Sequence, residues 1–223
     1  MAQDLAHKRP WLLASLAFGL TYPASSLLNI PGTFEIIWKM LPLALLIPYA
    51  LRRHHSGEFA ILAVILALCS MGDGLVEISL ELGAIAFGLS HLAAIWLYGR
   101  NRRDKTAFSQ KFLALTVIIL APLIAYQLAG GLAAGYTLLL AAMAAMAWSS
   151  NFPRYRVGIG AMLFVISDLL IFAREGQGVR MPIINPAIWY LYYVGMVMIA
   201  TGVVQTLVKR GHHVGDTEDA VKI

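Results

Sequence analysis

Charged residues and cysteine are both scarce in this chain of 223 residues. Asp, Glu, Lys and Arg together make up only 13% of it, and Cys69 is the single cysteine. Because a soluble domain is usually about 25% charged, the composition excludes an ordinary cytosolic enzyme and a disordered chain. One cysteine allows no disulfide within the chain, which also excludes a disulfide-rich secreted module.

Apolar residues take the place of the missing charges. They amount to 59% of the chain, and the mean hydropathy is +0.72. The net charge of +5 comes from short basic clusters between long apolar runs, whereas a nucleic-acid-binding protein gathers basic residues on one exposed face. The runs are continuous, unlike barrel strands, which alternate apolar and polar residues over about ten positions. We therefore predict an all-α multi-pass membrane protein with no nucleic-acid partner.

About eight apolar runs are candidates for membrane-spanning helices, which need about 20 mostly apolar residues each. Several runs are close to this lower limit, so counts of seven and nine stay open. We expect one integral membrane domain over residues 1–223 and a disordered tail over about 211–223. The expected spans are roughly 10–28, 34–51, 59–80, 82–98, 107–128, 132–149, 157–174 and 187–208.

The basic residues predict how the bundle is oriented. Fourteen of the seventeen Lys and Arg residues fall at one end of the predicted bundle, Arg174 and Arg180 fall at the other, and Lys39 lies within the second span. Since cytoplasmic loops are rich in Lys and Arg, we expect both termini in the cytoplasm, with a bacterial inner (plasma) membrane as the location. A cleaved signal peptide ending near Ala24 is the alternative for the first span.

Several ionisable residues lie inside the predicted spans, where they are costly unless they face the bundle interior or a wet cavity. Asp73 and Glu77 stand four residues apart on the third span, which places them on one helical face. Two tyrosines follow the start of the last span at a similar depth. We predict a polar chamber in the outer half of the bilayer. Its expected members are Lys39, Asp73, Glu77, His91, Asp168, Tyr192 and Tyr193.

Three other interpretations of these residues stay open. The two aspartates are also suited to a structural role as partners of Lys39 and His91. A metal site would need three ligands, and His91 is the one histidine at membrane depth, so Asp73, His91 and Asp168 are the candidate ligands. We expect no metal and no cofactor. A serine hydrolase finds little support, because the G-x-S-x-G motif is absent.

Two buried carboxylic acids suit acid–base chemistry. When they lie close together in an apolar site they do not both ionise readily, so one stays protonated beside an ionised partner. Such a pair supplies an acid and a base at neutral pH. It protonates a substrate and activates water without a metal or a covalent intermediate.

Short motifs on five of the spans carry a family resemblance. They are Lys39-Met40-Leu41-Pro42, Met71-Gly72-Asp73, Gly88-Leu89-Ser90-His91 with Tyr98, Gly160-Ala161 with Phe164 and Ser167-Asp168, and Tyr192-Tyr193 on the last span. With these motifs the chain resembles the YhhN-like family over about residues 36–205. That family includes lysoplasmalogenases, eight-helix membrane hydrolases that cleave the vinyl ether bond of lysoplasmalogens.

The resemblance implies a reaction and roles for the chamber residues. The products would be a fatty aldehyde and a glycerophospho-alcohol, and the partners a lysophospholipid substrate and the lipid bilayer. Asp73 and Asp168 would be the acid–base pair, with their individual roles open. The substrate-binding residues would be Lys39 at the phosphate, together with Glu77, His91, Tyr192 and Tyr193. A proton-coupled transporter and a lipid-translocating or lipid-binding protein are the alternatives.

Overall fold

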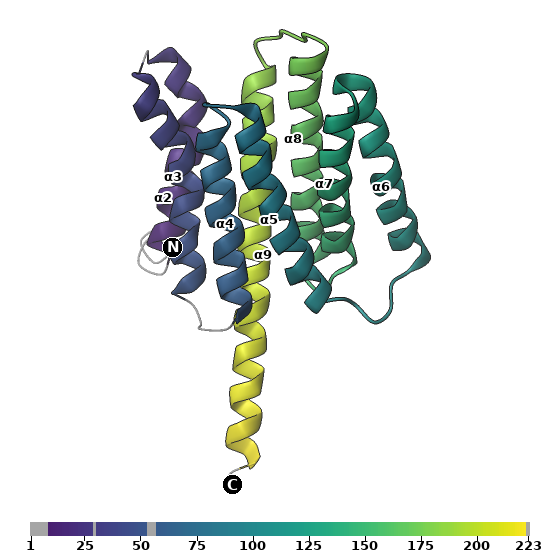
Figure 1. Cartoon of the computed structure of the whole chain (residues 1–223). Helices are drawn as coiled ribbons and strands as arrows, with labels where there is room; N and C mark the ends of the chain where they lie inside the picture. The colour runs from purple at the N-terminus through teal and green to yellow at the C-terminus, as the bar shows by residue number, and fades with distance from the viewer. Residues whose placement is uncertain (1–8, 29, 53–56, 222–223) are drawn as a thin grey trace.

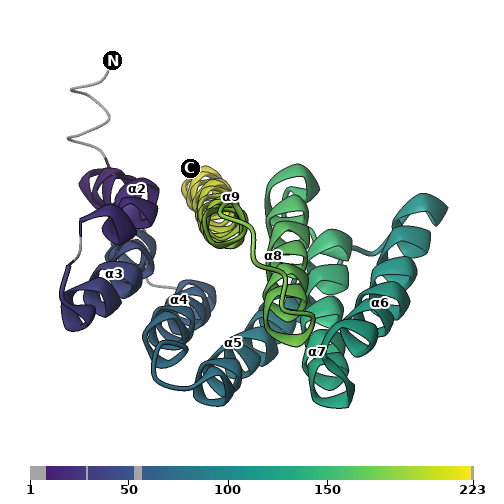
Figure 2. The same ribbon diagram turned by 90° about the horizontal axis from the view of Figure 1, so that it is seen from above.

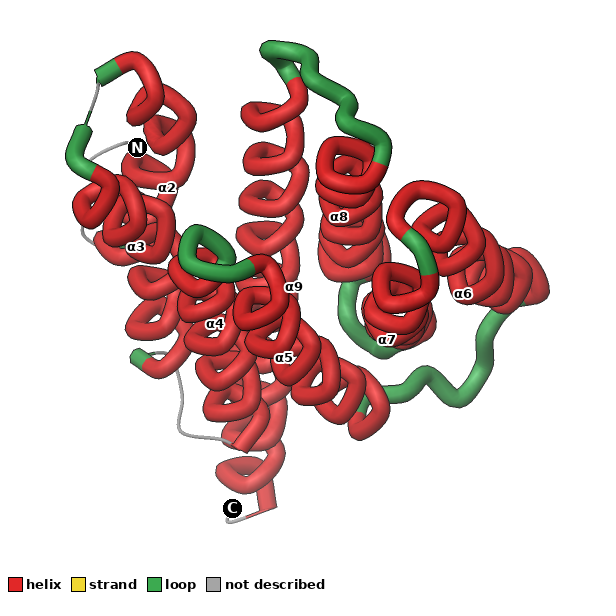
Figure 3. Tube along the Cα trace, turned by 45° about the horizontal axis from the view of Figure 1, so that its top comes forward, coloured by secondary structure: helices red, strands yellow, loops and turns green. Residues whose placement is uncertain are grey.

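The structure is a computed structural model that describes residues 9–28, 30–52 and 57–221. For residues 26, 27 and 211–221 it describes the backbone only. The described residues form eight α-helices joined by short loops and no strand (Figure 3). The α-helices are α2 (Pro10–Thr21), α3 (Gly32–Leu51), α4 (Gly57–Leu75), α5 (Leu80–Arg100), α6 (Phe108–Ala129), α7 (Gly131–Ser149), α8 (Ile159–Gly176) and α9 (Ile184–Val221). A 3₁₀-helix, η1 (Tyr22–Leu27), follows α2, and a π-helical turn, η2 (Arg154–Gly158), precedes α8.

Seven helices of the described chain, α3 to α9, are long and apolar enough to cross a membrane. Large apolar side chains project from the bundle, as on α6, where Leu115, Ile119 and Leu123 are each about half exposed. Such a surface suits lipid rather than water, and helices satisfy their backbone polar groups internally, as a span must. The prediction of an all-α multi-pass integral membrane protein is confirmed.

The first predicted span is shorter than expected. Its α-helix, α2, has 12 residues, and the 3₁₀-helix η1 adds six. Pro23 lacks the N–H that a continuing α-helix would need. Because a 3₁₀-helix rises about 2.0 Å per residue and an α-helix about 1.5 Å, the two segments together advance by up to about 30 Å along the chain. The run is helical, as predicted, but its α-helical part is too short to count among the seven.

Two predicted boundaries are corrected. The third span was expected to reach residue 80, but α4 ends at Leu75, because Ser79 caps the next helix by accepting a hydrogen bond from the Leu82 N–H at 3.3 Å. The expected disordered tail instead continues α9 as far as Val221. No proline follows Pro186 to end that helix. Residues 222–223 lie outside the described chain.

Consecutive helices run in opposite directions through the bundle (Figure 1). Seen from above, α2, α3, α4 and α5 follow one another along one side, while α6, α7 and α8 form the other (Figure 2). Helix α9 returns between these two groups and contacts α3, α4 and α8. In this view α9 lies between α2 and α8. It continues beyond the bundle at the end where α2 begins.

That end of the bundle, here named the basic end, carries most of the described Lys and Arg residues. Of the basic residues counted there in the sequence, Lys8, Arg53 and Lys222 lie outside the described chain. A polar network closes this end around Asn101: its Nδ2 donates to Oε1 of Glu58 at 2.6 Å, and its Oδ1 accepts from Arg210 at 2.5 Å. The network ties α4, α5 and α9 together.

Helices α8 and α9 approach closely at a pair of glycines. A Cβ added to Gly160 would lie 2.5 Å from the carbonyl oxygen of Gly195, and one added to Gly195 would lie 2.6 Å from that of Gly160. Small residues allow such backbone contact between membrane helices. Between α5 and α9, in contrast, the rings of Phe87 and Tyr192 meet with centroids 5.8 Å apart. Side chains rather than backbones fill that part of the core, and the candidate site lies there.

Candidate active site

Asp73 is buried near the far end of the bundle, opposite the basic end. It lies in the last turn of α4 and is only 2% exposed. The hydroxyl of Tyr192, on α9, donates to its Oδ2 at 3.0 Å. This hydrogen bond connects α4 directly with the last helix, α9.

Asp168, on α8, is 6% exposed and belongs to a hydrogen-bonded chain of three residues. The hydroxyl of Tyr136, on α7, donates to Oδ2 of Asp168 at 2.8 Å, and Nε2 of His91, on α5, lies 3.2 Å from the same hydroxyl oxygen. Because a tyrosine hydroxyl has one proton, His91 is the donor in that second bond. The chain therefore runs from His91 through Tyr136 to Asp168.

An aromatic cluster connects the two aspartates. It is formed by Phe87, His91, Phe164 and Tyr192. Phe164 has its ring centroid 4.9 Å from that of Tyr192 and 5.1 Å from that of His91. Tyr192 contacts Asp73, and His91 leads to Asp168, so the cluster joins the two groups. The rings exclude water and lower the local polarity, which strengthens electrostatic interactions with a bound molecule.

Each aspartate keeps free capacity for hydrogen bonds. Within the described chain Asp73 accepts one side-chain hydrogen bond, from Tyr192, and Asp168 accepts one, from Tyr136. A carboxylate offers about four lone-pair sites. Both groups are therefore able to contact a substrate or water while their tyrosines hold them in place.

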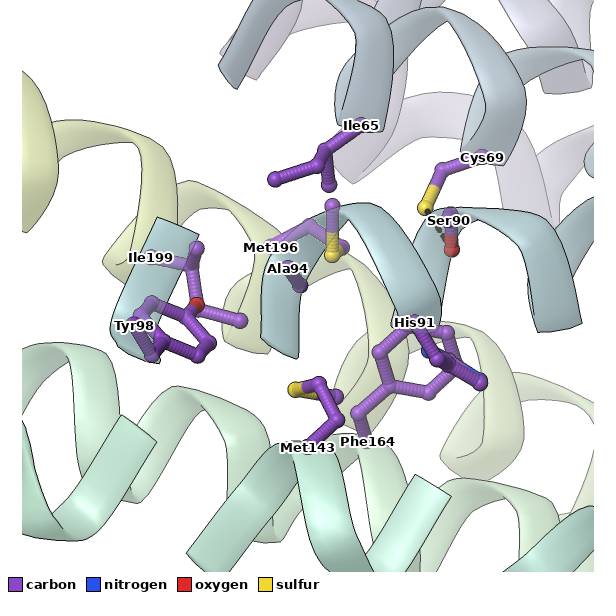
Figure 4. A pocket seen from close by; sticks show the side chains of 10 residues that line it. All are labelled: Ile65, Cys69, Ser90, His91, Ala94, Tyr98, Met143, Phe164, Met196 and Ile199. Carbon is purple, nitrogen blue, oxygen red and sulfur yellow. Dashed lines mark hydrogen bonds between the residues drawn. The ribbon is translucent and has the colours of Figure 1, made fainter. Parts of the chain in front are cut away.

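A small cavity opens beside this cluster (Figure 4). It has room for about one water molecule. Its polar lining is near His91, where the Cys69 thiol donates to Oγ of Ser90 at 3.3 Å. The residues that line the cavity are Ile65, Cys69, Ser90, His91, Ala94, Tyr98, Met143, Phe164, Met196 and Ile199.

Lys39 and Glu77 pair with each other rather than with the aspartates. Nζ of Lys39, on α3, lies 2.5 Å from Oε1 of Glu77, and their side chains are 16% and 40% exposed. The prediction that Glu77 shares a helical face with Asp73 is wrong, since α4 ends at Leu75 and Glu77 lies in the following turn. The ion pair stands near the far end of the bundle, at a more exposed level than the aspartates.

Tyr193 points away from the aspartates, although its neighbour Tyr192 reaches them. Its hydroxyl lies 2.9 Å from that of Ser15 on α2, and its ring stacks on that of Trp189 at 5.7 Å. Adjacent helical residues point about 100° apart, so the two tyrosines serve different interfaces. Tyr193, which was predicted for the chamber, therefore contacts α2 instead of an aspartate.

Sequence reasoning missed Tyr136, the residue that connects His91 with Asp168. It is half-buried on the apolar helix α7, where a tyrosine has no unusual cost. The sequence feature that could have identified Tyr136 is its hydroxyl group, which lies inside an apolar run at the depth of Asp168 and His91.

Metal ligands do not gather in the described part of the chain. No group of three or more His, Cys, Asp and Glu residues there is arranged to hold an ion. The candidate ligand set of Asp73, His91 and Asp168 is not assembled, because the contact between His91 and Asp168 runs through the Tyr136 hydroxyl.

Comparison with known proteins identifies the family. Neither the curated proteins nor the solved structures include a match to this chain. The model of the YhhN family matches residues 34–203, about three quarters of the sequence. This match contains both aspartates, the two tyrosines that hold them, and His91. The chain therefore belongs to the YhhN family.

Proposed function

We propose that this protein is an intramembrane hydrolase that cleaves the vinyl ether bond of lysoplasmalogens. The observation that carries the proposal is the pair of buried aspartates, Asp73 and Asp168, each held by a tyrosine beside one aromatic cluster. Membership in the YhhN family is consistent with a hydrolase. The site is inside the bundle, so its substrate is a lipid that enters from the bilayer.

The reaction needs one acid, one base and one water molecule. A protonated carboxyl group gives its proton to the β-carbon of the vinyl ether, and an oxocarbenium ion forms at the carbon bonded to oxygen. Water adds to that carbon while the second carboxylate takes up its proton, which gives a hemiacetal. Breaking the C–O bond of the hemiacetal then releases the fatty aldehyde and the glycerophospho-alcohol, and one water molecule is consumed overall.

The surrounding residues have separate roles in this proposal. The tyrosines, Tyr136 and Tyr192, orient the two carboxyl groups, and His91 orients Tyr136. Lys39 binds the phosphate of the head group, and Glu77 is its counterion while the site is empty. The aromatic rings beside the aspartates stabilise the positive charge that develops on the oxocarbenium ion.

The proposed orientation follows from the distribution of basic residues. The basic end faces the cytoplasm, as expected from the enrichment of Lys and Arg in cytoplasmic loops. Both termini are then cytoplasmic, and the aspartates lie in the outer half of a bacterial inner membrane. Substrate enters from the outer leaflet in this arrangement.

The direct test is the release of aldehyde from a lysoplasmalogen by the purified protein, beside an ester lysophospholipid. We expect aldehyde from the vinyl ether and no fatty acid from the ester. Asp73→Asn and Asp168→Asn should each lower the rate by about 10²–10⁴-fold. Asp104→Asn, at an exposed aspartate of the basic end, is the matched control and should be fully active.

The other outcomes point to different functions. Fatty acid from the ester would keep a hydrolase but change the bond that it cleaves. Inactivity on both lipids, combined with proton-driven uptake into vesicles, would replace the proposal with a transporter. Tight lysolipid binding without product over hours would favour a lipid-binding protein.

A further inference from the structure

The residues that line the cavity of Figure 4 lie on the same helix faces as the aspartate site, one or two turns away along the chain. On α4, Cys69 and Ile65 lie four and eight residues before Asp73, and on α9, Met196 lies four residues after Tyr192. Residues four apart share one face of a helix, and each such step moves about 6 Å along the axis. The cavity therefore begins one turn below the aspartate site, toward the basic end.

The lining residues of α8 and α5 show the same helical spacing. On α8, Phe164 lies one turn from Asp168, and on α5 the residues His91, Ala94 and Tyr98 line one face. Seven residues of helix separate His91 from Tyr98, which is about 10 Å. Four helices thus present a continuous face that leads from the carboxyl groups into the core.

The walls below His91 are apolar and include flexible side chains. Ile65, Ala94 and Ile199 contribute branched or small groups, while Met143 and Met196 contribute unbranched thioethers. Methionine adapts its shape through three rotatable bonds. The cavity has room for about one water molecule, so a hydrocarbon chain enters only if the two methionine side chains rotate to make space.

The cavity is closed toward the basic end. Tyr98 is 1% exposed, and its ring packs edge-on against Phe152 with centroids 6.1 Å apart. The guanidinium of Arg210 covers Phe152 at 5.5 Å and also donates to Asn101. Beyond Tyr98 there is a polar network, so an apolar occupant would end at that ring.

We propose that this cavity is the binding site for the hydrocarbon chain of a single-chain lipid, and that Ala94 and Met196 determine the chain length it accepts. The inference rests on the proposed function, because it names where the chain of that substrate lies. A vinyl ether at the aspartates joins a head group to a hydrocarbon chain. The charged pair of Lys39 and Glu77 marks the direction of the head group, and the apolar cavity leads the opposite way.

Filling the cavity gives the first test. Ala94→Leu should lower kcat/KM for long alkenyl chains by roughly tenfold for every two methylene groups displaced, while short chains react as before. Ala60→Leu adds the same atoms at an exposed position of α4 and should not change the preference. A folded Ala94→Leu protein with an unchanged ratio of long-chain to short-chain rates would overturn the proposal.

Widening the cavity gives the second test. Met196→Ala should raise the rate ratio in favour of long or bulky chains, and Val194→Ala, at an exposed position of the same helix, should leave it unchanged. If Met196→Ala does not fold, Met143→Ala tests the opposite wall.

A binding measurement separates this proposal from the reaction. Short-chain and long-chain ester lysophospholipids are titrated into Asp168→Asn and into Asp168→Asn with Ala94→Leu. If the second protein binds only the long-chain probe more weakly, the result supports the cavity as the hydrocarbon-chain site, even if no vinyl ether is cleaved. If both proteins bind both probes equally, the proposal is overturned, even if the unmodified protein releases aldehyde.

Discussion

The Tyr192 hydroxyl donates to Oδ2 of Asp73 at 3.0 Å, although 119 positions separate the two residues in the chain. This bond fixes the last helix against the end of α4 and orients the carboxyl group toward the aromatic cluster. The equivalent bond from Tyr136 holds Asp168 at 2.8 Å. Each proposed catalytic group therefore depends on a tyrosine from a different helix.

Removing the Tyr192 hydroxyl tests the first of these bonds. Tyr192→Phe should lower kcat by about ten- to a hundredfold, because a hydrogen bond to a charged group contributes about 1.5–3 kcal/mol. The control is Tyr190→Phe, which also loses a hydrogen bond, but one from its hydroxyl to the Leu20 carbonyl on α2 at 3.0 Å rather than to a carboxyl group. Equal rates for the two variants would show that Tyr192 does not orient Asp73.

His91 should act on Asp168 only through Tyr136. Tyr136→Phe and His91→Gln are each expected to lower kcat and to shift its pH profile. The double variant should lose less than the sum of the two single losses, since the bond to His91 is already lost in Tyr136→Phe; this gives a coupling energy of about 0.5–3 kcal/mol in a double-mutant cycle. Tyr155→Phe, at an exposed position of η2, is the control. Additive losses of the two single variants would show that His91 does not act through Tyr136.

The unusual residues of the site were predictable from sequence, and its connections were not. Asp73 and Asp168 stand out because a carboxyl group inside an apolar run is costly unless it faces the interior. Tyr136 carries no such cost, so only the register of α7 against α8 shows that it reaches Asp168. Tyr192 and Tyr193 are neighbours, and their assignment to different interfaces depends on the rotation of α9 about its axis.

The ends of the helices were predictable only in part. Apolar length located the seven long helices, but it extended the third span past Leu75, because Leu80 and Leu82 prolong the apolar composition. The capping hydroxyl of Ser79 sets that boundary, and with it the position of Glu77. Composition also suggested a disordered tail after Gly211, whereas the helix continues where no proline ends it.

The ion pair of Lys39 and Glu77 predicts a kinetic effect on substrate binding. Lys39→Met should raise KM about tenfold and leave kcat within about twofold, because losing an interaction made equally in ground and transition states changes KM alone. Lys111→Met, at an exposed position of α6, should behave like the unmodified protein. A loss in kcat without a change in KM would instead place Lys39 in the chemical step.

Orientation in the membrane is testable with single cysteines. Cys69 is fully buried, so the unmodified protein should not react with a membrane-impermeant maleimide. In intact cells Arg180→Cys, at the far end, should be labelled, and Arg103→Cys, at the basic end, should be labelled only after the membrane is opened. The reverse pattern would place both termini outside the cytoplasm.

Stability should depend on the contact between Gly160 and Gly195. Gly160→Ala puts a methyl group 2.5 Å from the Gly195 carbonyl oxygen, and backbone atoms do not yield as a flexible side chain does. We expect a loss of about 1–3 kcal/mol and a lower melting temperature in detergent. Gly135→Ala is the matched control, because its added methyl group meets nothing within 4 Å, and it should gain up to about 1 kcal/mol from helix propensity.

Since Gly160 lies two turns from Asp168 on α8, a separation of the two helices at this point should also displace the carboxyl group. A Gly160→Ala protein as stable as Gly135→Ala would mean that α8 and α9 do not pack as closely as described.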